Sequence, residues 1–141
     1  MSEKDADGAV KFRFRHTMLP VADMERAVDF YTRLLGMQVV RRRSQGGDGR
    51  EIAYVGYGAE GTHPVLELIA GTGDEGKPWA GHFSIAVADL TALCATLEAE
   101  GVRFTRQLVA PQGGTNELVA NIVDADGFEI ELNQRKGGIY N

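Results

Sequence analysis

His16 opens the stretch HTMLPVADM, residues 16–24, and His82 opens a second stretch, HFSIAVADL, residues 82–90. The tripeptide Val-Ala-Asp follows each histidine at the same distance. A repeat of this kind indicates two similar structural units in one chain. Because a unit this short rarely buries its own apolar face, we expect the two units to pair through their sheets.

The second halves of the two units also correspond, because VLEL at 65–68 matches EIEL at 129–132. Each unit therefore carries one glutamate near its end, Glu67 in the first and Glu131 in the second. Two histidines and two carboxylates in equivalent places are a donor set for a divalent metal ion. A single histidine is equally well explained as a hydrogen-bonded core residue, but packing hardly explains the joint pattern.

The order of elements predicted for each unit is βαβββ. Asp23 and Asp89 are typical helix N-caps, and Gly36 and Gly101 are typical left-handed residues that end helices. The first helix is expected over Met24–Leu35, where apolar residues recur at helical spacing. Strands are expected at 12–21, 37–42, 51–57 and 65–69, and in the second unit at 81–87, 102–107, 117–124 and 128–133.

The length of 141 residues suits one domain with a sizeable core. We expect this domain at 10–141, after a flexible tail at 1–9. Its two repeats are expected at about 12–70 and 80–134, joined by the polar, glycine-rich segment 71–78.

Composition predicts a protein without nucleic-acid or membrane partners. The net charge of −5 disfavours nucleic acid. The basic run Arg41–Arg43 is interpreted as a strand end in solvent. No apolar run approaches the ~20 residues of a membrane span, and the polar start of the chain does not resemble a signal peptide. The single cysteine, Cys94, excludes an internal disulfide, suits a reducing compartment such as the cytoplasm, and is interpreted as a buried helical thiol.

Glu67 is the candidate ligand with the strongest individual signal. It lies between Leu66 and Leu68 in an apolar strand, where a carboxylate is costly to bury unless it is paired or bound to a metal. Two residues share the strand face of Glu131, namely Glu129 and Asn133. They either line the same pocket and orient ligands, or face solvent.

Several motifs together resemble glyoxalase I (lactoylglutathione lyase) of the short bacterial type, within the vicinal oxygen chelate superfamily. The motifs are HTML at 16–19, DFY at 29–31, LGM at 35–37, YVGYG at 54–58, EL at 67–68, GH at 81–82 and DGFEIEL at 126–132. The resemblance implies an α+β fold in which two tandem βαβββ modules form a cup-shaped mixed sheet.

The resemblance also implies a homodimer with one divalent metal in each site between the subunits. His16 and Glu67 of one chain would join His82 and Glu131 of the other. Nickel or cobalt is the metal associated with the short bacterial form, and the ligand set would also accept zinc, manganese or iron. No other cofactor is implied.

The implied reaction converts the hemithioacetal of a 2-oxoaldehyde, such as methylglyoxal, and a thiol into a 2-hydroxyacyl thioester. A metal would stabilise the enediolate, and a carboxylate would move the proton between neighbouring carbons. By resemblance Glu131 is the first choice for this base and Glu67 the second. The alternatives are another metal-dependent enzyme of the superfamily, such as an epimerase or dioxygenase, and a metal-free binding protein of the same fold.

The chain departs from the family where the thiol is held. Pro20, Gly71 and Gln112 stand where the family usually has arginine, asparagine and lysine. Proline has no side-chain donor with which to clamp a carboxylate. The identity of the thiol, glutathione or another, is therefore left open.

Overall fold

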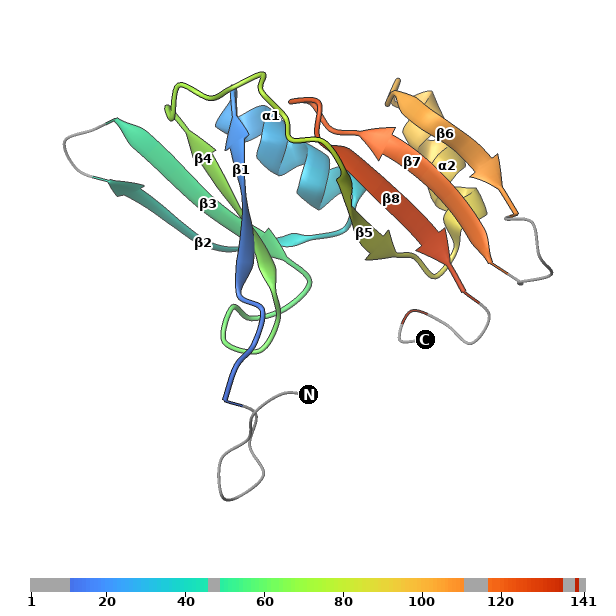
Figure 1. Cartoon of the computed structure of the whole chain (residues 1–141), viewed down its shortest axis with the longest axis horizontal. Coiled ribbons are helices and arrows are strands. Elements are labelled where there is room, and N and C mark those ends of the chain that lie inside the picture. The colour runs from blue at the N-terminus through green and yellow to red at the C-terminus, as the bar shows by residue number, and fades with distance from the viewer. Residues whose placement is uncertain (1–10, 46–48, 111–116, 136–138, 140–141) are drawn as a thin grey trace.

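The computed structural model describes residues 11–45, 49–110, 117–135 and 139. Within this part of the chain each repeat has the predicted order βαβββ (Figure 1). The first repeat comprises β1 (His16–Val21), α1 (Met24–Asp29), a π-helical turn η1 (Phe30–Leu34), β2 (Gln38–Gln45), β3 (Arg50–Gly56) and β4 (Val65–Ala70). The second comprises β5 (His82–Ala86), α2 (Leu90–Ala99), β6 (Phe104–Val109), β7 (Leu118–Val123) and β8 (Glu129–Gln134).

The strands of the described residues form two four-stranded mixed sheets with the same topology. Their orders are β1-β4-β3-β2 and β5-β8-β7-β6. In each sheet the first and last strands of the repeat pair in parallel, and the other pairs are antiparallel. The α+β fold of two βαβββ modules is therefore as predicted. This topology places the start of each repeat directly beside its end.

The first strand is shorter than predicted. It begins at His16 rather than at residue 12, because its neighbour β4 begins at Val65, the register partner of His16. Phe12 and Phe14 precede the strand and are 66% and 70% exposed. The alternating apolar pattern therefore continues beyond the point at which a neighbouring strand is available.

The first helix differs from the predicted single α-helix. The N-cap is confirmed, since the Asp23 carboxylate accepts a hydrogen bond from the backbone N–H of Arg26. After Asp29 the helix widens into a π-turn, in which the N–H of Leu35 donates to the carbonyl of Phe30 at 3.3 Å. Gly36 then ends the helix with φ of +75°, as predicted.

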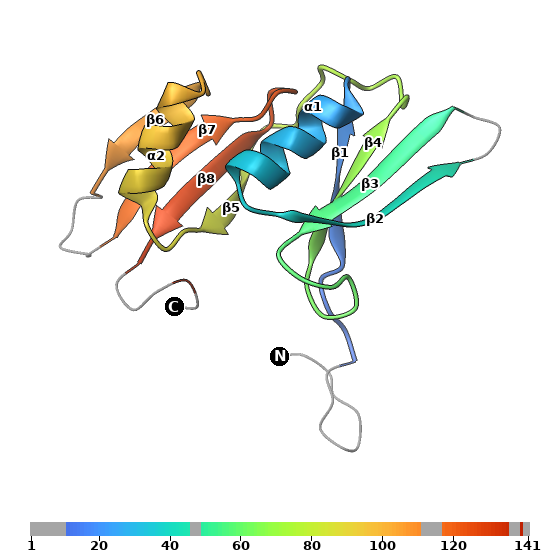
Figure 2. The same cartoon turned by 180° about the vertical axis from the view of Figure 1, so that it is seen from behind.

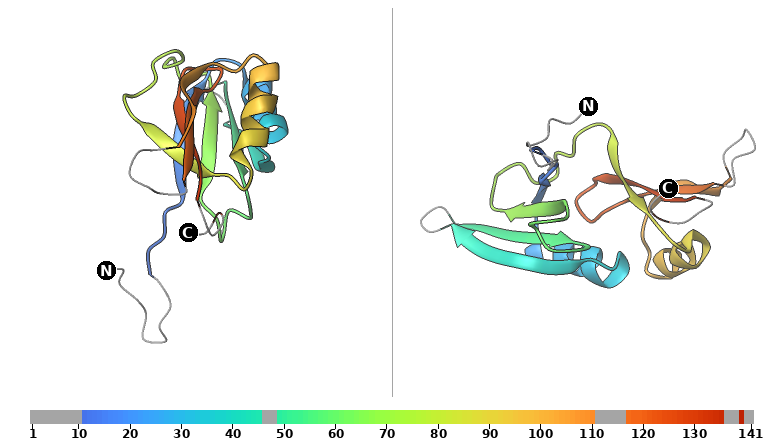
Figure 3. Two further views of the ribbon diagram at one scale, coloured as in Figure 1. Left: turned by 90° about the vertical axis from the view of Figure 1, so that its right-hand side faces the viewer. Right: turned by 90° about the horizontal axis from the view of Figure 1, so that it is seen from below.

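One hydrophobic core is shared by the two modules. The helices lie on the same side of the two sheets (Figures 2 and 3). Tyr31 and Leu68 of the first module belong to the same buried cluster as Leu97 and Leu132 of the second. The helix-covered face of each sheet is therefore committed to packing, and the opposite face is available for a site.

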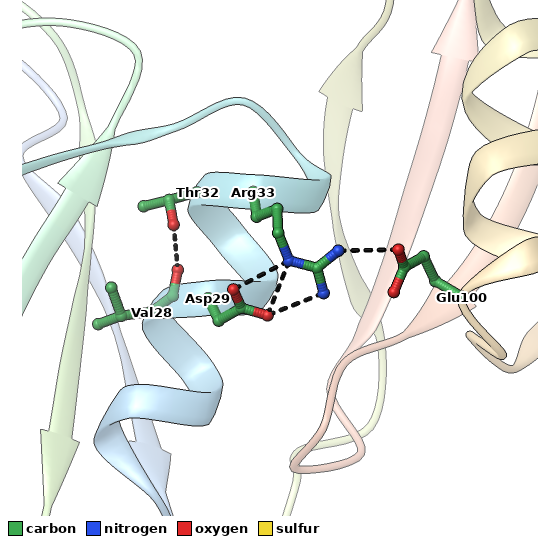
Figure 4. A network of polar contacts seen from close by, with 5 residues as sticks. All are labelled: Val28, Asp29, Thr32, Arg33 and Glu100. Atoms are coloured by element: carbon green, nitrogen blue, oxygen red, sulfur yellow. Dashed lines mark hydrogen bonds and ion pairs between the residues drawn. The ribbon is translucent and has the colours of Figure 1, made fainter.

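Polar contacts also join the modules. The Tyr31 hydroxyl donates to the buried carboxylate of Asp124 at 2.5 Å. Arg33 binds Asp29 one helical turn earlier and reaches Glu100, at the end of α2, at 2.8 Å (Figure 4). The two repeats are thus connected by contacts that no strand pairing provides.

Three expectations on chain organisation have different outcomes. The segment 71–78 is irregular and connects the modules, as predicted. The expected tail at 1–9 lies outside the described residues, as does Gln112. Within the described ranges no helix is both long and apolar enough to cross a membrane.

Candidate metal centre

The first candidate ligand pair lies on β1 and β4. The parallel pairing of these strands aligns Met18 with Glu67 and brings His16 to the same sheet face. The Nε2 atom of His16 lies 3.6 Å from Oε1 of Glu67. Glu67 is only 9% exposed, so its carboxylate is largely removed from water.

The second candidate pair lies at the equivalent place on β5 and β8. Here Ser84 is the register partner of Glu131. The Nε2 atom of His82 lies 3.3 Å from Oε2 of Glu131. The Glu131 side chain is 28% exposed, against 12% for the Glu67 side chain, so the second pair is the more open to solvent.

The structure brings the four residues together as two pairs and not as one cluster. Among the described residues of a single chain, no group of three or more histidine, cysteine or acidic side chains could hold a metal ion. Each pair supplies one imidazole nitrogen and one carboxylate, a mixture that suits first-row divalent metals. Each pair therefore fits half of a metal site.

The Glu67 carboxylate has a neighbour that the sequence did not point to. The Tyr54 hydroxyl, on β3, donates to Oε2 of Glu67 at 2.5 Å. Arg43, on β2, donates in turn to the Tyr54 oxygen at 3.2 Å, and the guanidinium of Arg41 lies 4.2 Å from the centre of the Tyr54 ring. Burial, together with the bond to Glu67, raises the pKa of Tyr54, so this phenol stays protonated at neutral pH.

The three arginines of the basic run Arg41–Arg43 therefore make specific contacts, whereas the sequence predicted only a strand end in solvent. All three side chains are exposed, yet each has a different partner. Arg41 forms an ion pair with Glu60 and Arg42 with Glu25, whereas Arg43 bonds Tyr54. Strand alternation could have distinguished these arginines in the sequence, because it points Arg42 to the opposite sheet face from Arg41 and Arg43.

Glu131 has weaker hydrogen bonds. Its Oε1 atom accepts from the hydroxyl of Ser84 at 3.3 Å and from the amide of Asn133 at 3.2 Å. The interpretation that Asn133 orients a ligand is therefore supported by its direct contact with a candidate ligand. Glu129 instead accepts a long hydrogen bond, 3.4 Å, from Asn121.

His63 and Cys94 lie outside both pairs. His63 is exposed on the loop before β4, where its Nδ1 contacts the Thr62 hydroxyl. Cys94 is buried in α2, and burial raises the pKa of its thiol, which is unfavourable for a nucleophile. Pro20 and Gly71 offer no side-chain donor.

An open apolar cavity lies between the two modules near the second pair. Its volume is about 620 Å³. Leu34 and Leu35 line it from the first module, and Ser84 to Ala88 line it from the second. Ser84 lines this cavity, and its hydroxyl donates a hydrogen bond to the carboxylate of Glu131.

Comparison with known proteins identifies the class to which this fold and these pairs belong. Residues 13–132 match the sequence model of the Glyoxalase/Bleomycin resistance protein/Dioxygenase superfamily. The match covers most of the chain, and the protein belongs to this superfamily.

Individual relatives narrow the class. A probable lactoylglutathione lyase of Vibrio cholerae is 37% identical over 128 residues, which cover 88% of this chain and 91% of the relative. The lactoylglutathione lyase of Escherichia coli O157:H7 is 35% identical over the same length, covering 93% of that protein. Within the superfamily the chain is a glyoxalase I-like lyase.

Solved structures agree with this placement. The trypanothione-dependent glyoxalase I of Leishmania major superposes with a TM-score of 0.75 and 32% identity, covering 90% of this chain and 89% of that one. Glyoxalase I from Zea mays gives a TM-score of 0.77 at 32% identity, over 87% of this chain and 44% of the longer maize chain. The superposition extends over both modules.

Proposed function

We propose that this protein is a metal-dependent glyoxalase I that isomerises the hemithioacetal of a 2-oxoaldehyde and a small thiol. The observation that carries the proposal is the pair of half-sites, His16 with Glu67 and His82 with Glu131, at equivalent positions of a glyoxalase fold. A metal site of four ligands then requires two chains. The proposed assembly is a homodimer in which His16 and Glu67 of one protomer face His82 and Glu131 of its partner.

Exposed apolar surface supports this assembly. The cavity between the modules is lined mainly by aliphatic side chains, and Phe12 and Phe14 project from the start of the described chain. Surfaces of this kind are typical of contacts with another protein chain. A C₂ dimer would use each patch twice and generate two identical sites.

The proposed ligands divide the chemical work between them. A divalent ion held by the four side chains would supply Lewis acidity towards the two adjacent oxygens of the substrate. Nickel or cobalt is proposed from the resemblance, and zinc, manganese or iron would also suit the donors. Glu131 is the proposed base: its carboxylate takes the proton from the carbon bearing sulfur and returns it to the neighbouring carbon, with no net gain or loss of atoms.

The exposure of the two carboxylates supports this choice of base. Glu67 is buried and accepts a short hydrogen bond from Tyr54, which favours a fixed orientation. Glu131 is more exposed and accepts longer bonds from Ser84 and Asn133, so its side chain can move towards the substrate. Glu67 is the second candidate.

The thiol is the part of the substrate for which the chain offers the fewest identifiable binding residues. Arg13, Arg15 and Lys77 are the cations that could replace the contacts missing at Pro20, Gly71 and Gln112. Arg13 donates to the backbone carbonyl of Glu60, and Lys77 lies beside the carboxylate of Asp74. The proposed compartment is the cytoplasm, because the single cysteine is unpaired and buried, as suits a reducing environment.

A thiol panel tests the proposed reaction. Protein loaded with nickel or cobalt is assayed with methylglyoxal and glutathione, and beside it with smaller and differently charged thiols. We expect turnover with at least one thiol and its loss in Glu131→Gln, which keeps the size of the side chain but removes the base. Metal-replete protein that turns over none of the hemithioacetals would overturn the proposal and leave membership of the superfamily intact. A fully active Glu131→Gln variant would transfer the role of base to Glu67.

A further inference from the structure

We propose that Tyr54, held in turn by Arg43, is a positioning residue that fixes the carboxylate of Glu67 for metal binding. The inference rests on the proposed function, because it assigns a role to a neighbour of a proposed ligand. Tyr54 acts through Glu67 and does not itself touch the substrate or the metal in this scheme.

The first argument is the geometry of the contact. Tyr54 and Glu67 are register partners on the antiparallel strands β3 and β4, so their side chains leave the sheet on the same face. The Tyr54 hydroxyl donates to Oε2 of Glu67, while Oε1 of the same carboxylate faces Nε2 of His16. One oxygen is therefore held by the phenol, and the other is oriented towards the other candidate ligand of the pair.

The second argument is that Tyr54 is itself held by several contacts. Its ring belongs to a small buried cluster with Ile52, Val65 and Ile69. Arg43 donates to the phenol oxygen, and Arg41 stacks on the ring while bound to Glu60. A donor with so little freedom transmits a fixed orientation to the group it binds.

The third argument is a difference between the two repeats. The register partner of Glu131 on β7 is Asn121, which takes the place that Tyr54 has in the first repeat. The amide of Asn121 donates to Glu129, and its buried Oδ1 atom has no hydrogen-bond partner among the described residues. The second repeat therefore has no tyrosine donor at the position that Tyr54 occupies in the first repeat. This difference fits a fixed carboxylate at Glu67 and a mobile one at Glu131.

Removing the phenol oxygen tests the inference with the metal alone as probe. Tyr54→Phe keeps the ring in its apolar cluster and deletes the donor. The dissociation constant of Co²⁺ is measured by competition with a chromophoric chelator, and the visible absorption of the Co²⁺-loaded protein reports its coordination. We expect binding weakened about 10- to 100-fold, the usual effect of losing a hydrogen-bond partner of a ligand, and an altered cobalt spectrum.

Two further comparisons of Co²⁺ affinity distinguish a positioning role of Tyr54 from a role in packing alone. In a Glu67→Gln background, Tyr54→Phe should cause no additional loss of Co²⁺ affinity, because Tyr54 acts through the carboxylate. Arg43→Gln should weaken Co²⁺ binding less than Tyr54→Phe. The matched control is Arg42→Gln. Arg42 is the sequence neighbour of Arg43 but pairs with Glu25 on α1, so this variant should bind Co²⁺ as the wild type does.

The outcomes are distinct. Wild-type Co²⁺ affinity and an unchanged cobalt spectrum in Tyr54→Phe would overturn the inference, as would equal effects of Arg43→Gln and Arg42→Gln. Failure of the proposed metal site itself would look different, since His16→Ala would then also leave Co²⁺ binding unchanged. A Tyr54→Phe variant with reduced melting temperature but normal Co²⁺ binding would assign the hydroxyl to folding alone.

Discussion

Single side chains decide how firmly the two repeats hold together. Asp124 is a buried carboxylate, and burial raises its pKa. Its Oδ1 atom accepts from the backbone N–H groups of Asp126 and Phe128, and its Oδ2 atom accepts from the hydroxyl of Tyr31 in the other module. A charged group in such surroundings depends on each of these donors.

Tyr31→Phe should therefore destabilise the protein through Asp124. The substitution keeps the buried ring and removes the hydroxyl that donates to this carboxylate from the other module. We expect the free energy of unfolding to fall by about 1–3 kcal/mol, the cost of leaving a buried polar group without a partner. Urea denaturation followed by circular dichroism measures it. Tyr57→Phe is the comparison, since Tyr57 is a half-exposed residue whose hydroxyl donates to the backbone carbonyl of Leu35. A larger loss in that variant would contradict the argument.

At the scale of elements, the end of the first helix carries a polar contact to the second module. Arg33 lies on the π-turn η1, and its guanidinium bridges Asp29 and the Glu100 carboxylate at the end of α2 (Figure 4). The hydrogen bond from Arg33 is the main cause of a lowered pKa of Asp29. This bridge is exposed, so we expect it to respond to pH and salt.

The contribution of Asp29 should be lost in acid. Because the pKa of Asp29 is lower in the folded protein than its ordinary value of 3.8, ionised Asp29 stabilises the fold above that value. The contribution declines as pH falls through the lowered pKa. The melting temperature of Asp29→Asn should therefore lie below that of the wild type at pH 7, and the difference should shrink as the pH approaches 3. Thermal melts across this range provide the measurement, and a difference that grows in acid would refute the sign.

Sequence patterns predicted the elements well where local chemistry determines them. The caps at Asp23 and Gly36 are set by side-chain and backbone preferences within a few residues. The start of β1 and the π-turn were not predicted. The first depends on where β4 begins, and the second depends on how the helix packs into the core shared by both modules.

The candidate site likewise has parts that local sequence patterns predict and parts that depend on distant contacts. The repeat identified His16, Glu67, His82 and Glu131, and strand pairing within each module brings each histidine beside its glutamate. Tyr54 escaped notice because its contact with Glu67 depends on the register of β3 against β4. Whether one chain brings all four candidate ligands together depends on the placement of whole modules, which no local pattern encodes.

At the scale of the whole molecule, the two pairs predict complementation between inactive variants. His16→Ala and His82→Ala should each be inactive alone. If sites form between protomers, a mixed dimer has one site with all four ligands intact. Random reassortment should therefore restore about a quarter of the wild-type activity, because about half of the dimers are mixed and each has one intact site of two.

The matched control is a mixture of His16→Ala with Glu67→Gln. Both changes fall in the same half-site, so every site of the mixed dimer lacks a ligand and no activity should return. Mass spectrometry under native conditions establishes that subunits have exchanged. Exchange without recovery in the first mixture would place each site within a single chain.

The pairing of first and last strands in each repeat also determines the order in which the two sheets can form during synthesis. β1 pairs with β4 across almost the whole first repeat, His16 being opposite Val65, so the sheet closes only when its last strand arrives. A chain growing on the ribosome completes β4 at Ala70 before β5 begins at His82. The N-terminal sheet can thus close early, while the residues of the first module that share a core with Leu97 and Leu132 lack these partners until the second half is synthesised. During that interval the nascent protein displays a surface that a chaperone, or another nascent chain, can bind.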